Sequence, residues 1–371
     1  MKYYIIAGEA SGDLHGSNLI KELKIIDTQA EIRCWGGDLM QSAGATLIKH
    51  YKELAFMGFA EVAKNLTTIL NNIKFCKSDI LEFKPDVIIF IDYPGFNLRI
   101  AQWAKKQGLK THYYISPQIW AWKESRIKAI KRDIDQLYVI LPFEKDFYEN
   151  KHHFKVHFVG HPLIDAIQQF KAHPNPNFIT ENQLSEKPII ALLPGSRKQE
   201  ITQMLSVMLS VVHDFPDYQF VIAGAPGQDT DFYRPFLKTN QVKLISNQTY
   251  DLLSVASAAL VTSGTATLET ALFKIPQIVC YKTSNVSYQI GKRLVKLKFI
   301  SLVNLIMDKE VVKELIQDDF NEQNLEKELH KIIDGYQRAL MFIDYYDLEK
   351  KLGGKGASKK VAELIIEKSL K

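Results

Sequence analysis

Val261–Ala271, with the sequence VTSGTATLETA, is the stretch that decides the fold. An apolar run typical of a β-strand ends at Thr262, Gly264 permits a tight turn, and a helical segment begins at Thr265. A strand, a glycine turn and a helix in immediate succession indicate a parallel sheet whose strands are joined by helices. The unpaired backbone N–H groups at the start of such a helix can bind a diphosphate.

Glu269 lies on the first or second turn of this predicted helix, where its carboxylate could accept hydrogen bonds from both hydroxyls of a ribose. Ser263, Gly264 and Thr265 would then surround the phosphates. Taken alone, the pattern also fits a packed helix that is merely capped by Thr265 or Thr267.

A second turn of the same kind, Pro194–Arg197, follows the apolar run Ile189–Leu193 and precedes another predicted helix. A guanidinium at this position could bind phosphate in a bidentate manner and stabilise the charge on a departing diphosphate. The alternative is a surface arginine at a helix start, which the helix dipole mildly disfavours. The sequence GxxxxGK[ST] is absent, which excludes a P-loop ATPase, and the lack of GxGxxG disfavours a dinucleotide site.

The N-terminal half repeats the alternation of strands and helices. The run DVIIFID, residues 86–92, is almost wholly apolar, as expected of a strand buried on both faces of a parallel sheet. Asp92 would lie at the mouth of that sheet, where a carboxylate can take a proton from a substrate hydroxyl, although an aspartate that caps the next segment fits equally well. Glu9 and Asp13, in the first glycine loop, are candidates of the same kind.

Length and composition limit the possible classes of protein. The chain has 371 residues, of which 46% are apolar and 24% charged, and this suits two globular domains. Its net charge of +5 is too mild for a typical nucleic-acid-binding domain. Three widely spaced cysteines argue against disulfides and against a zinc site. Neither a secretory signal nor an apolar run of about 20 residues is present, which predicts a cytoplasmic protein that does not span a membrane.

A segment rich in Pro, Asn, Gln and Lys near the middle of the chain is the predicted linker, residues 169–186. It separates a first domain, 1–168, from a second, 187–346. Because both halves alternate strands with helices, we predict two facing, doubly wound α/β domains, with ligands beyond the carboxyl ends of the strands.

Motifs along nearly the whole chain resemble those of the lipid-A-disaccharide synthase family. They occur in the family's order: GEASGDLHG (8–16), MGFAEV (57–62), PDVIIFIDYPGFN (85–97), YYISPQIWAW (113–122), LPFEKDFY (141–148), FVGHPL (158–163), LLPGSRKQEI (192–201), SGTATLETAL (263–272) and KRLVKLKFISLVNLI (292–306). Single motifs are moderately specific, whereas the ensemble is highly specific.

The resemblance implies a GT-B fold with two Rossmann-like domains, and a C-terminal segment, 347–371, that returns to the first domain. It implies an inverting transfer without a metal ion or other cofactor. The donor would be UDP-2,3-diacylglucosamine and the acceptor 2,3-diacylglucosamine 1-phosphate. The products would be UDP and a β-1,6-linked disaccharide 1-phosphate of lipid A biosynthesis.

The family's functional residues match positions of this chain. Asp92, Arg197, Glu269 and Asn304 correspond to residues that are important in the family, and Glu9 and Ser11 fall in its N-terminal loop motif. We expect Asp92 and Arg197 to be catalytic, and Arg197, Ser263, Gly264, Thr265, Glu269 and Asn304 to bind the donor. Glu9, Ser11 and Asp13 are expected to form an acceptor-side loop. Val303 departs from the pattern because a proline is expected before Asn304, and its loss would loosen the loop that carries Asn304.

Substrates with several acyl chains imply that the enzyme works on the cytoplasmic face of the inner membrane. Lys292, Arg293, Lys296 and Lys298 alternate with apolar residues and would suit an anionic leaflet, although solvated helix faces often look the same. A second basic cluster contains Lys123, Arg126, Lys128, Lys131 and Arg132.

Two other functions fit parts of the pattern. An isomerase of the UDP-N-acetylglucosamine 2-epimerase type would share the diphosphate site but would act on a soluble sugar. A nucleotide-sugar-binding protein without turnover could keep Arg197 and Glu269 but would not need a base at Asp92.

Neutralising Lys292, Arg293, Lys296 and Lys298 together is expected to release the protein from anionic vesicles. Each basic group near an anionic surface contributes roughly 1 kcal/mol, so the fourfold change should be visible in cosedimentation. Unchanged cosedimentation would place the attachment in another segment, such as residues 57–73.

Overall fold

The computed structural model describes residues 1–54, 66–284, 288–289 and 297–370. The chain forms two compact units. The first contains Met1–Asp165 together with Leu352–Lys371, and the second contains Ala166–Lys351. The chain passes from the first unit to the second inside one helix, α8 (Pro162–Ala172), and it returns after α17 (Tyr336–Lys351).

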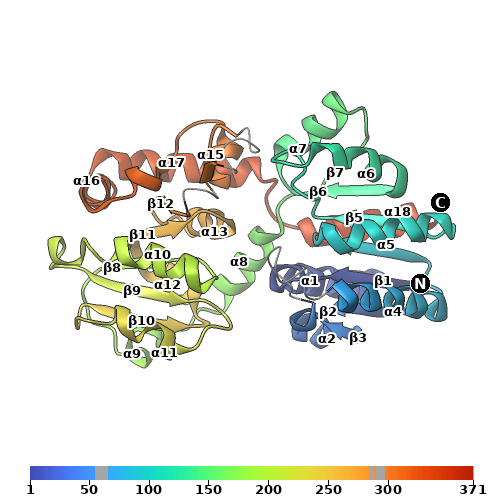
Figure 1. Ribbon diagram of the computed structural model, residues 1–371, viewed down its shortest axis with the longest axis horizontal. Coiled ribbons are helices and arrows are strands. Elements are labelled where there is room, and N and C mark those ends of the chain that lie inside the picture. Colours follow the sequence, from blue (N-terminus) through green and yellow to red (C-terminus); the bar gives the residue numbers. More distant parts are fainter. Residues whose placement is uncertain (55–65, 285–287, 290–296, 371) are drawn as a thin grey trace. The chain divides into compact units, whose positions relative to one another are not determined.

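The first unit is built on a parallel sheet with the strand order β3-β2-β1-β4-β5-β6-β7 (Figure 1). The strands are β1 (Lys2–Ala7), β2 (Glu31–Gly36), β3 (Thr46–His50), β4 (Val87–Ile91), β5 (Lys110–Tyr114), β6 (Gln136–Val139) and β7 (His157–Phe158). Every residue of β4 is buried, which explains its unbroken run of β-branched and aromatic side chains.

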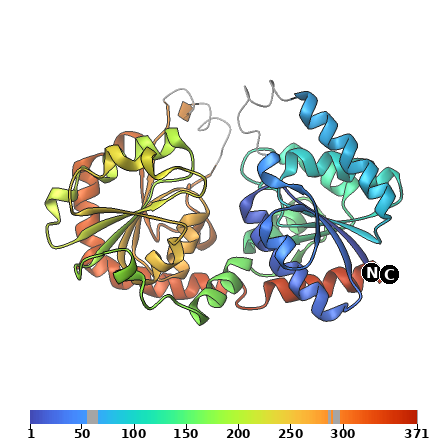
Figure 2. The same cartoon turned by 90° about the horizontal axis from the view of Figure 1, so that it is seen from below.

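Helices cover both faces of this sheet (Figure 2). They are α1 (Ala10–Ile26), α2 (Asp38–Ser42), α4 (Leu66–Phe83), α5 (Pro94–Lys106), α6 (Ile127–Asp133), α7 (Pro142–Asp146) and α18 (Ala357–Leu370). The C-terminal helix α18 packs against α1 and contacts β5, so the end of the chain completes the first unit. This confirms the predicted return of a C-terminal helix to the first domain.

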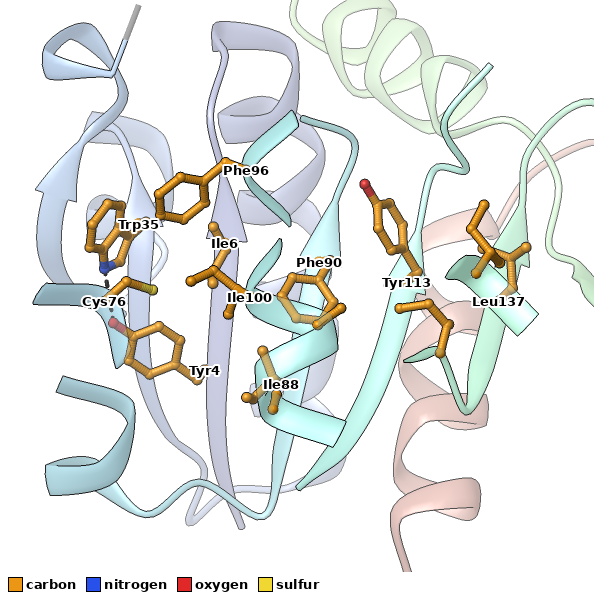
Figure 3. Close-up of a cluster of buried hydrophobic side chains, with 14 of the residues drawn as sticks. Tyr4, Ile6, Trp35, Cys76, Ile88, Phe90, Phe96, Ile100, Tyr113 and Leu137 are labelled. Atoms are coloured by element: carbon orange, nitrogen blue, oxygen red, sulfur yellow. Dashed lines mark hydrogen bonds between the residues drawn. The ribbon is translucent and has the colours of Figure 1, made fainter. Parts of the chain in front are cut away.

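One apolar cluster fills the space between this sheet and the helices α4, α5 and α6 (Figure 3). Alternate residues of the strands point into it, among them Ile88 and Phe90, because side chains along a strand alternate between faces. Trp35 is fully buried there and donates its indole N–H to the hydroxyl of Tyr4 at 2.8 Å. The hydroxyl of Tyr113 points out of the cluster instead (Figure 3).

The second unit is built on a parallel sheet with the order β10-β9-β8-β11-β12-β13. Its strands are β8 (Ile189–Leu193), β9 (Gln219–Gly224), β10 (Val242–Ser246), β11 (Ala256–Thr262), β12 (Gln277–Tyr281) and β13 (Lys313–Ile316). Its other helices are α9 (Phe178–Glu181), α10 (Lys198–Met208), α11 (Thr230–Tyr233), α12 (Thr249–Val255), α13 (Thr265–Leu272), α15 (Leu302–Met307) and α16 (Glu322–Ile333).

Both sheets are therefore doubly wound, and the predicted α/β class with two Rossmann-like domains is confirmed. In each sheet the strand order reverses between two central neighbours, which are β1 and β4 in the first unit and β8 and β11 in the second. Ligands of such sheets bind at the carboxyl ends of these two strands, since the loops that follow them leave in opposite directions.

The expected linker, residues 169–186, contains the end of α8 and all of α9, and it belongs to the second unit. Within the described residues, no helix is long and apolar enough to cross a membrane. Lys292, Arg293, Lys296 and residues 57–62 lie outside the described part of the chain.

Candidate active site

A cavity of about 450 Å³ opens at the point in the second sheet where β8 and β11 lie side by side. Its walls come from the loops that follow β8, β9 and β11 and from the start of α13. The residues that line it include most of the predicted donor-binding set: Arg197, Ser263, Gly264, Thr265 and Glu269. The sheet thus brings together residues that are far apart in the sequence.

Gly264 shapes the floor of this cavity. Its backbone has a φ of 155° and a ψ of −162°, a conformation that is essentially restricted to glycine. A Cβ atom at this position would meet no atom within 4 Å, so the constraint is backbone conformation and not space. The turn starts α13 at Thr265, and the N–H groups of Thr265 and Ala266 have no carbonyl partner within the helix, whereas that of Thr267 donates to the carbonyl of Gly264 at 3.2 Å. Together with the helix dipole, they favour an anion at this end of the cavity.

The turn Pro194–Arg197 forms the opposite wall. Gly195 has a φ of 99°, and the carboxylate of Glu200 packs so closely that a Cβ at Gly195 would lie 2.3 Å from Glu200 Oε2. Glu200 also accepts a hydrogen bond from the N–H of Ser196 at 3.2 Å, which fixes the turn. Arg197 is the N-cap residue of α10 and is exposed, so its guanidinium can reach an anion in the cavity.

Glu269 is held by Tyr250, whose hydroxyl donates a hydrogen bond to Glu269 Oε1 at 2.9 Å. Burial raises the pKa of the Glu269 carboxyl, and the hydrogen bond from Tyr250 partly offsets this effect. A carboxylate has capacity for about four hydrogen bonds, so one fixed contact leaves room for ligand hydroxyls. The Glu269 carboxylate is therefore oriented by one hydrogen bond and can still accept others.

Asn304 does not line this cavity, although the family resemblance implied that it binds the donor. It is fully buried, and its side-chain amide donates to the carbonyl of Val312 and to Glu314 Oε1 at 2.8 and 2.9 Å. Its carbonyl oxygen accepts the N–H groups of Val311 and Val312 at 2.8 and 3.0 Å. Both ends of its amide are therefore bound by the chain itself, and donor binding by Asn304 stays a prediction.

Asn304 is nevertheless connected to the cavity by hydrogen bonds through one loop. Glu314, which Asn304 helps to hold, accepts hydrogen bonds from the N–H groups of Ile300 and Ser301, both at 2.9 Å. The carbonyl of Ile300 then accepts a hydrogen bond from the hydroxyl of Ser263 at 2.8 Å. Asn304 and Glu314 therefore fix a loop that orients Ser263 in the wall of the cavity.

In the first unit, Asp92 directly follows β4 in a strained backbone conformation. Its φ is 42°, and that of Tyr93 is 50°, a left-handed conformation that costs a non-glycine residue of order 1–3 kcal/mol. The carbonyl of Asp92 accepts hydrogen bonds from Asn97 Nδ2 at 2.7 Å and from the hydroxyl of Tyr113 at 2.5 Å. Because the backbone is fixed from both sides, the carboxylate is held at the carboxyl edge of the sheet.

The pKa of Asp92 is raised to about 6, first by burial and then by the negative charge of Glu9. Glu9 is the exposed N-cap residue of α1 and follows β1, the strand beside β4. Ser11, in the first turn of α1, is also exposed. The structure thus brings Glu9 into electrostatic range of Asp92, at the strand pair where ligands of such sheets bind.

Asp13 differs from these residues and has a structural role. It is 3% exposed, and its carboxylate accepts hydrogen bonds from the N–H groups of Gly37, Leu39 and Met40 at 2.8, 3.1 and 3.0 Å. These donors belong to the start of α2, which Asp13 therefore caps from another helix. The chain itself thus takes three of the roughly four hydrogen bonds that a carboxylate can accept. A role of Asp13 in acceptor binding or proton transfer stays a prediction.

Three residues near the two sites were not singled out from the sequence: Glu200, Tyr250 and Glu144. Glu144 is fully buried and accepts hydrogen bonds from the N–H groups of Ile140 and Leu141 and from Trp120 Nε1. Burial raises its pKa to about 7, and the charge of Asp92 adds to the shift. Glutamate at the third position of a helix that starts near Pro142 was the available signal for Glu144.

Comparison with known families gives one match over nearly the whole chain. The family model described as "Lipid-A-disaccharide synthetase" matches residues 3–367. A lipid-A-disaccharide synthase of Coxiella burnetii is 36% identical over 373 residues, covering 97% of this chain and 96% of the relative. One from Syntrophus aciditrophicus is 38% identical, covering 98% and 96% respectively.

Among solved structures, the chain is similar to a UDP-GlcNAc 2-epimerase from Neisseria meningitidis, with a TM-score of 0.66 and 14% identity over the full length of both chains. A glycosyltransferase from Rickettsia africae gives a TM-score of 0.60 at 12% identity, covering 100% of this chain and 98% of the other. At such low identity these similarities establish the fold alone.

Substituting Asp13 with alanine is expected to lower the free energy of unfolding by about 1–3 kcal/mol, because three N–H groups at the start of α2 lose their acceptor. Urea denaturation would measure this change, with the exposed Asp38→Ala on α2 as control. Wild-type stability combined with a specific loss of turnover would instead give Asp13 a catalytic role.

Proposed function

The chain belongs to the lipid-A-disaccharide synthase family and is a glycosyltransferase, and we propose that its two sites divide the work of an inverting transfer. The donor is UDP-2,3-diacylglucosamine, and the acceptor is 2,3-diacylglucosamine 1-phosphate. The acceptor hydroxyl displaces UDP and forms a β-1,6 bond. The convergence of Arg197, Glu269 and the start of α13 on one cavity is the main structural support for this proposal.

The second unit binds the donor nucleotide. Glu269, oriented by Tyr250, accepts the ribose hydroxyls, and the N-terminal N–H groups of α13 bind the diphosphate. As the bond to the sugar breaks, negative charge grows on the leaving UDP, and Arg197 stabilises it. Fixed donors of this kind substitute for a metal ion at the leaving group. Among the described residues, the one grouping of potential metal ligands is His213, Asp214 and Glu322, none of which lines the cavity.

The first unit activates the acceptor. Asp92 accepts the proton of the attacking hydroxyl, and its raised pKa makes it a stronger base than an ordinary aspartate. Because this pKa is about 6, the carboxylate is mostly ionised at neutral pH and can act as a base. The strained backbone at Asp92 and Tyr93 supports a catalytic role, because such strain gathers at functional sites.

The substrates are lipid-linked sugars, and we propose that the enzyme attaches to the cytoplasmic face of the inner membrane without crossing it. Lys298 is the one basic residue of segment 292–298 that lies in the described part of the chain. It is two-thirds exposed, lies over the ring of Phe299 at 5.0 Å, and is 3.6 Å from Asp308. An exposed cation beside a half-buried aromatic ring suits an anionic membrane surface.

Two substitutions separate donor binding from leaving-group chemistry. Arg197→Ala is expected to lower kcat by about 10²-fold or more, the scale for losing one charge-stabilising donor. Glu269→Ala is expected mainly to weaken UDP binding, measured by calorimetry, and Tyr250→Phe should weaken it less. Arg234→Ala, an exposed arginine of the same unit, is the matched control. Full UDP affinity in Glu269→Ala would remove the ribose assignment.

The pH dependence of kcat/KM tests Asp92. Activity should fall below about pH 6, where the carboxyl becomes protonated. Glu9→Gln removes a negative charge that favours the protonated form, so the pKa of Asp92 should drop and the acidic limb should move to lower pH. Glu31→Gln, near the opposite end of the sheet, is the control.

Asp92→Asn keeps the shape of the side chain but removes the proton acceptor. Its turnover is expected to fall by about 10²–10⁴-fold while UDP affinity stays normal. An acidic limb that persists unchanged in Asp92→Asn would assign the base to another residue.

A further inference from the structure

The loop from β5 to α6, residues 115–126, carries charged side chains that the transfer described above does not use. It leaves β5 at Ile115, whose φ is 62°. The hydroxyl of Ser116 then forms a 2.5 Å hydrogen bond with that of Tyr148, and both side chains are buried. The base of the loop is therefore anchored to Tyr148.

Trp122, Lys123 and Arg126 form a compact group on this loop. Trp122 is 53% exposed although it is a large aromatic side chain. The Nζ atom of Lys123 lies 4.1 Å from the centre of the indole ring, and the Cζ atom of Arg126 lies 5.9 Å from it. Two cations thus share one exposed ring, an arrangement that orients both charges.

The two cations lack a counter-charge. Among the residues that the structure describes, no carboxylate forms an ion pair with Lys123 or Arg126. Glu124 lies between them in the sequence but pairs with Lys151 Nζ at 2.6 Å and with His152 Nε2 at 2.9 Å. Partial burial, and then the charge of Arg126, lower the pKa of Lys123. An anion bound here would relieve this repulsion.

The other residues of the basic cluster either bind a neighbouring group of the chain or are exposed to solvent. Lys131 donates to the carbonyl of His152 at 2.9 Å, and Arg132 pairs with Asp133 at 2.6 Å. Lys128 is exposed on α6. Lys123 and Arg126 therefore differ from their neighbours in combining an aromatic platform with an uncompensated charge.

This group lies at the same sheet edge as Asp92. Strand β5 pairs with β4 in parallel, and Tyr114 is in register with Ile91, the residue before Asp92. Tyr113 links the two places, because its hydroxyl donates to the carbonyl of Asp92 at 2.5 Å. Burial raises the pKa of Tyr113 well above its usual value, and the charges of Asp92 and Arg126 both act on it. Lys123, Arg126 and the proposed base Asp92 thus lie in one region of the first unit.

We propose that Lys123 and Arg126 bind the phosphate group of the acceptor sugar, with Trp122 packing against the sugar or its linked atoms. This subsite rests on the proposed function, which supplies an acceptor that carries a phosphomonoester. Arginine and lysine form charge-assisted hydrogen bonds with phosphate oxygens, and these hold the acceptor in register with Asp92. Both residues are positioning residues, since they touch the substrate away from the reacting hydroxyl.

The test is a cycle that changes both enzyme and substrate. Wild type and the variant Lys123→Gln/Arg126→Gln are assayed in neutral detergent with diacylglucosamine 1-phosphate and with its 1-O-methyl glycoside, which lacks phosphate. With the phosphorylated acceptor, the variant should lose about 10–100-fold in kcat/KM, mainly through KM, as expected for lost contacts between charged groups. With the methyl glycoside, wild type and variant should agree within about twofold, since both lack the same contact.

Lys128→Gln is the matched control, because it removes one charge from the same segment and should leave kcat/KM unchanged with both acceptors. Unchanged UDP affinity in all variants shows that the second unit is intact, and an unchanged Tm shows that the fold is preserved. Equal losses with both acceptors, or no loss with the phosphorylated one, would overturn the subsite.

Two further measurements separate the possible failures. Calorimetry of acceptor binding in detergent reports on the subsite without turnover. If the double variant weakens that binding while the wild type makes no disaccharide, the subsite stands and the proposed function fails. Cosedimentation with phosphatidylglycerol vesicles, without acceptor, should be unchanged in the variant. Loss of vesicle binding together with equal losses for both acceptors would assign these cations to the membrane surface instead.

Discussion

The parallel pairing of β8 with β11 is the constraint on which the proposed donor site depends. These strands are neighbours in the sheet but are separated in the chain by β9 and β10, so the loops that follow them diverge at the carboxyl edge. One loop ends in Arg197 and the other starts α13 at Thr265. Neither residue could meet the same diphosphate without that pairing. The pairing of β1 with β4 does the same for Glu9 and Asp92 in the first unit.

Rigid packing beneath these edges keeps the strained turns in place. The left-handed backbone at Asp92 and Tyr93 is retained because Asn97 and Tyr113 bind the carbonyl of Asp92 from two elements. Tyr93 in turn packs on Gly8, where a Cβ would come within 2.3 Å of its ring. Tyr113 belongs to the apolar cluster through its ring and to the site through its hydroxyl (Figure 3). The core thus contributes directly to the geometry of the sheet edge where we propose that Asp92 acts.

The apolar strands and glycine turns could be predicted from the sequence, since β4, β8 and β12 are almost unbroken apolar runs. Strand β5 could not be predicted in this way, because its buried positions include the polar residues Thr111 and His112. Their polar atoms are satisfied by Asp133, Asp135 and Tyr138, which come from later parts of the chain. The strand, turn and helix pattern and the family resemblance both indicated Arg197, Glu269 and Asp92 as candidates, but neither could tell which matched residues contact a ligand directly.

The number of hydrogen bonds that a side chain makes within the chain distinguishes matched residues that can contact a ligand from those that hold the structure together. Asp13 accepts three backbone N–H groups, and Asn304 has both ends of its amide bound, so turning either side chain toward a substrate would leave buried N–H groups without their partner. Glu269, by contrast, is held at one oxygen by Tyr250, which orients it and leaves capacity for further hydrogen bonds. Substituting a residue whose hydrogen-bonding groups are all bound within the chain should therefore lower stability or displace a neighbouring loop. Substitution of Asn304, for example, should displace Ser263, because Asn304 holds Glu314 and Glu314 holds the loop that Ser263 contacts. Loss of activity after mutation of Asn304 would consequently report on the position of Ser263, and a kinetic defect alone cannot identify a ligand contact.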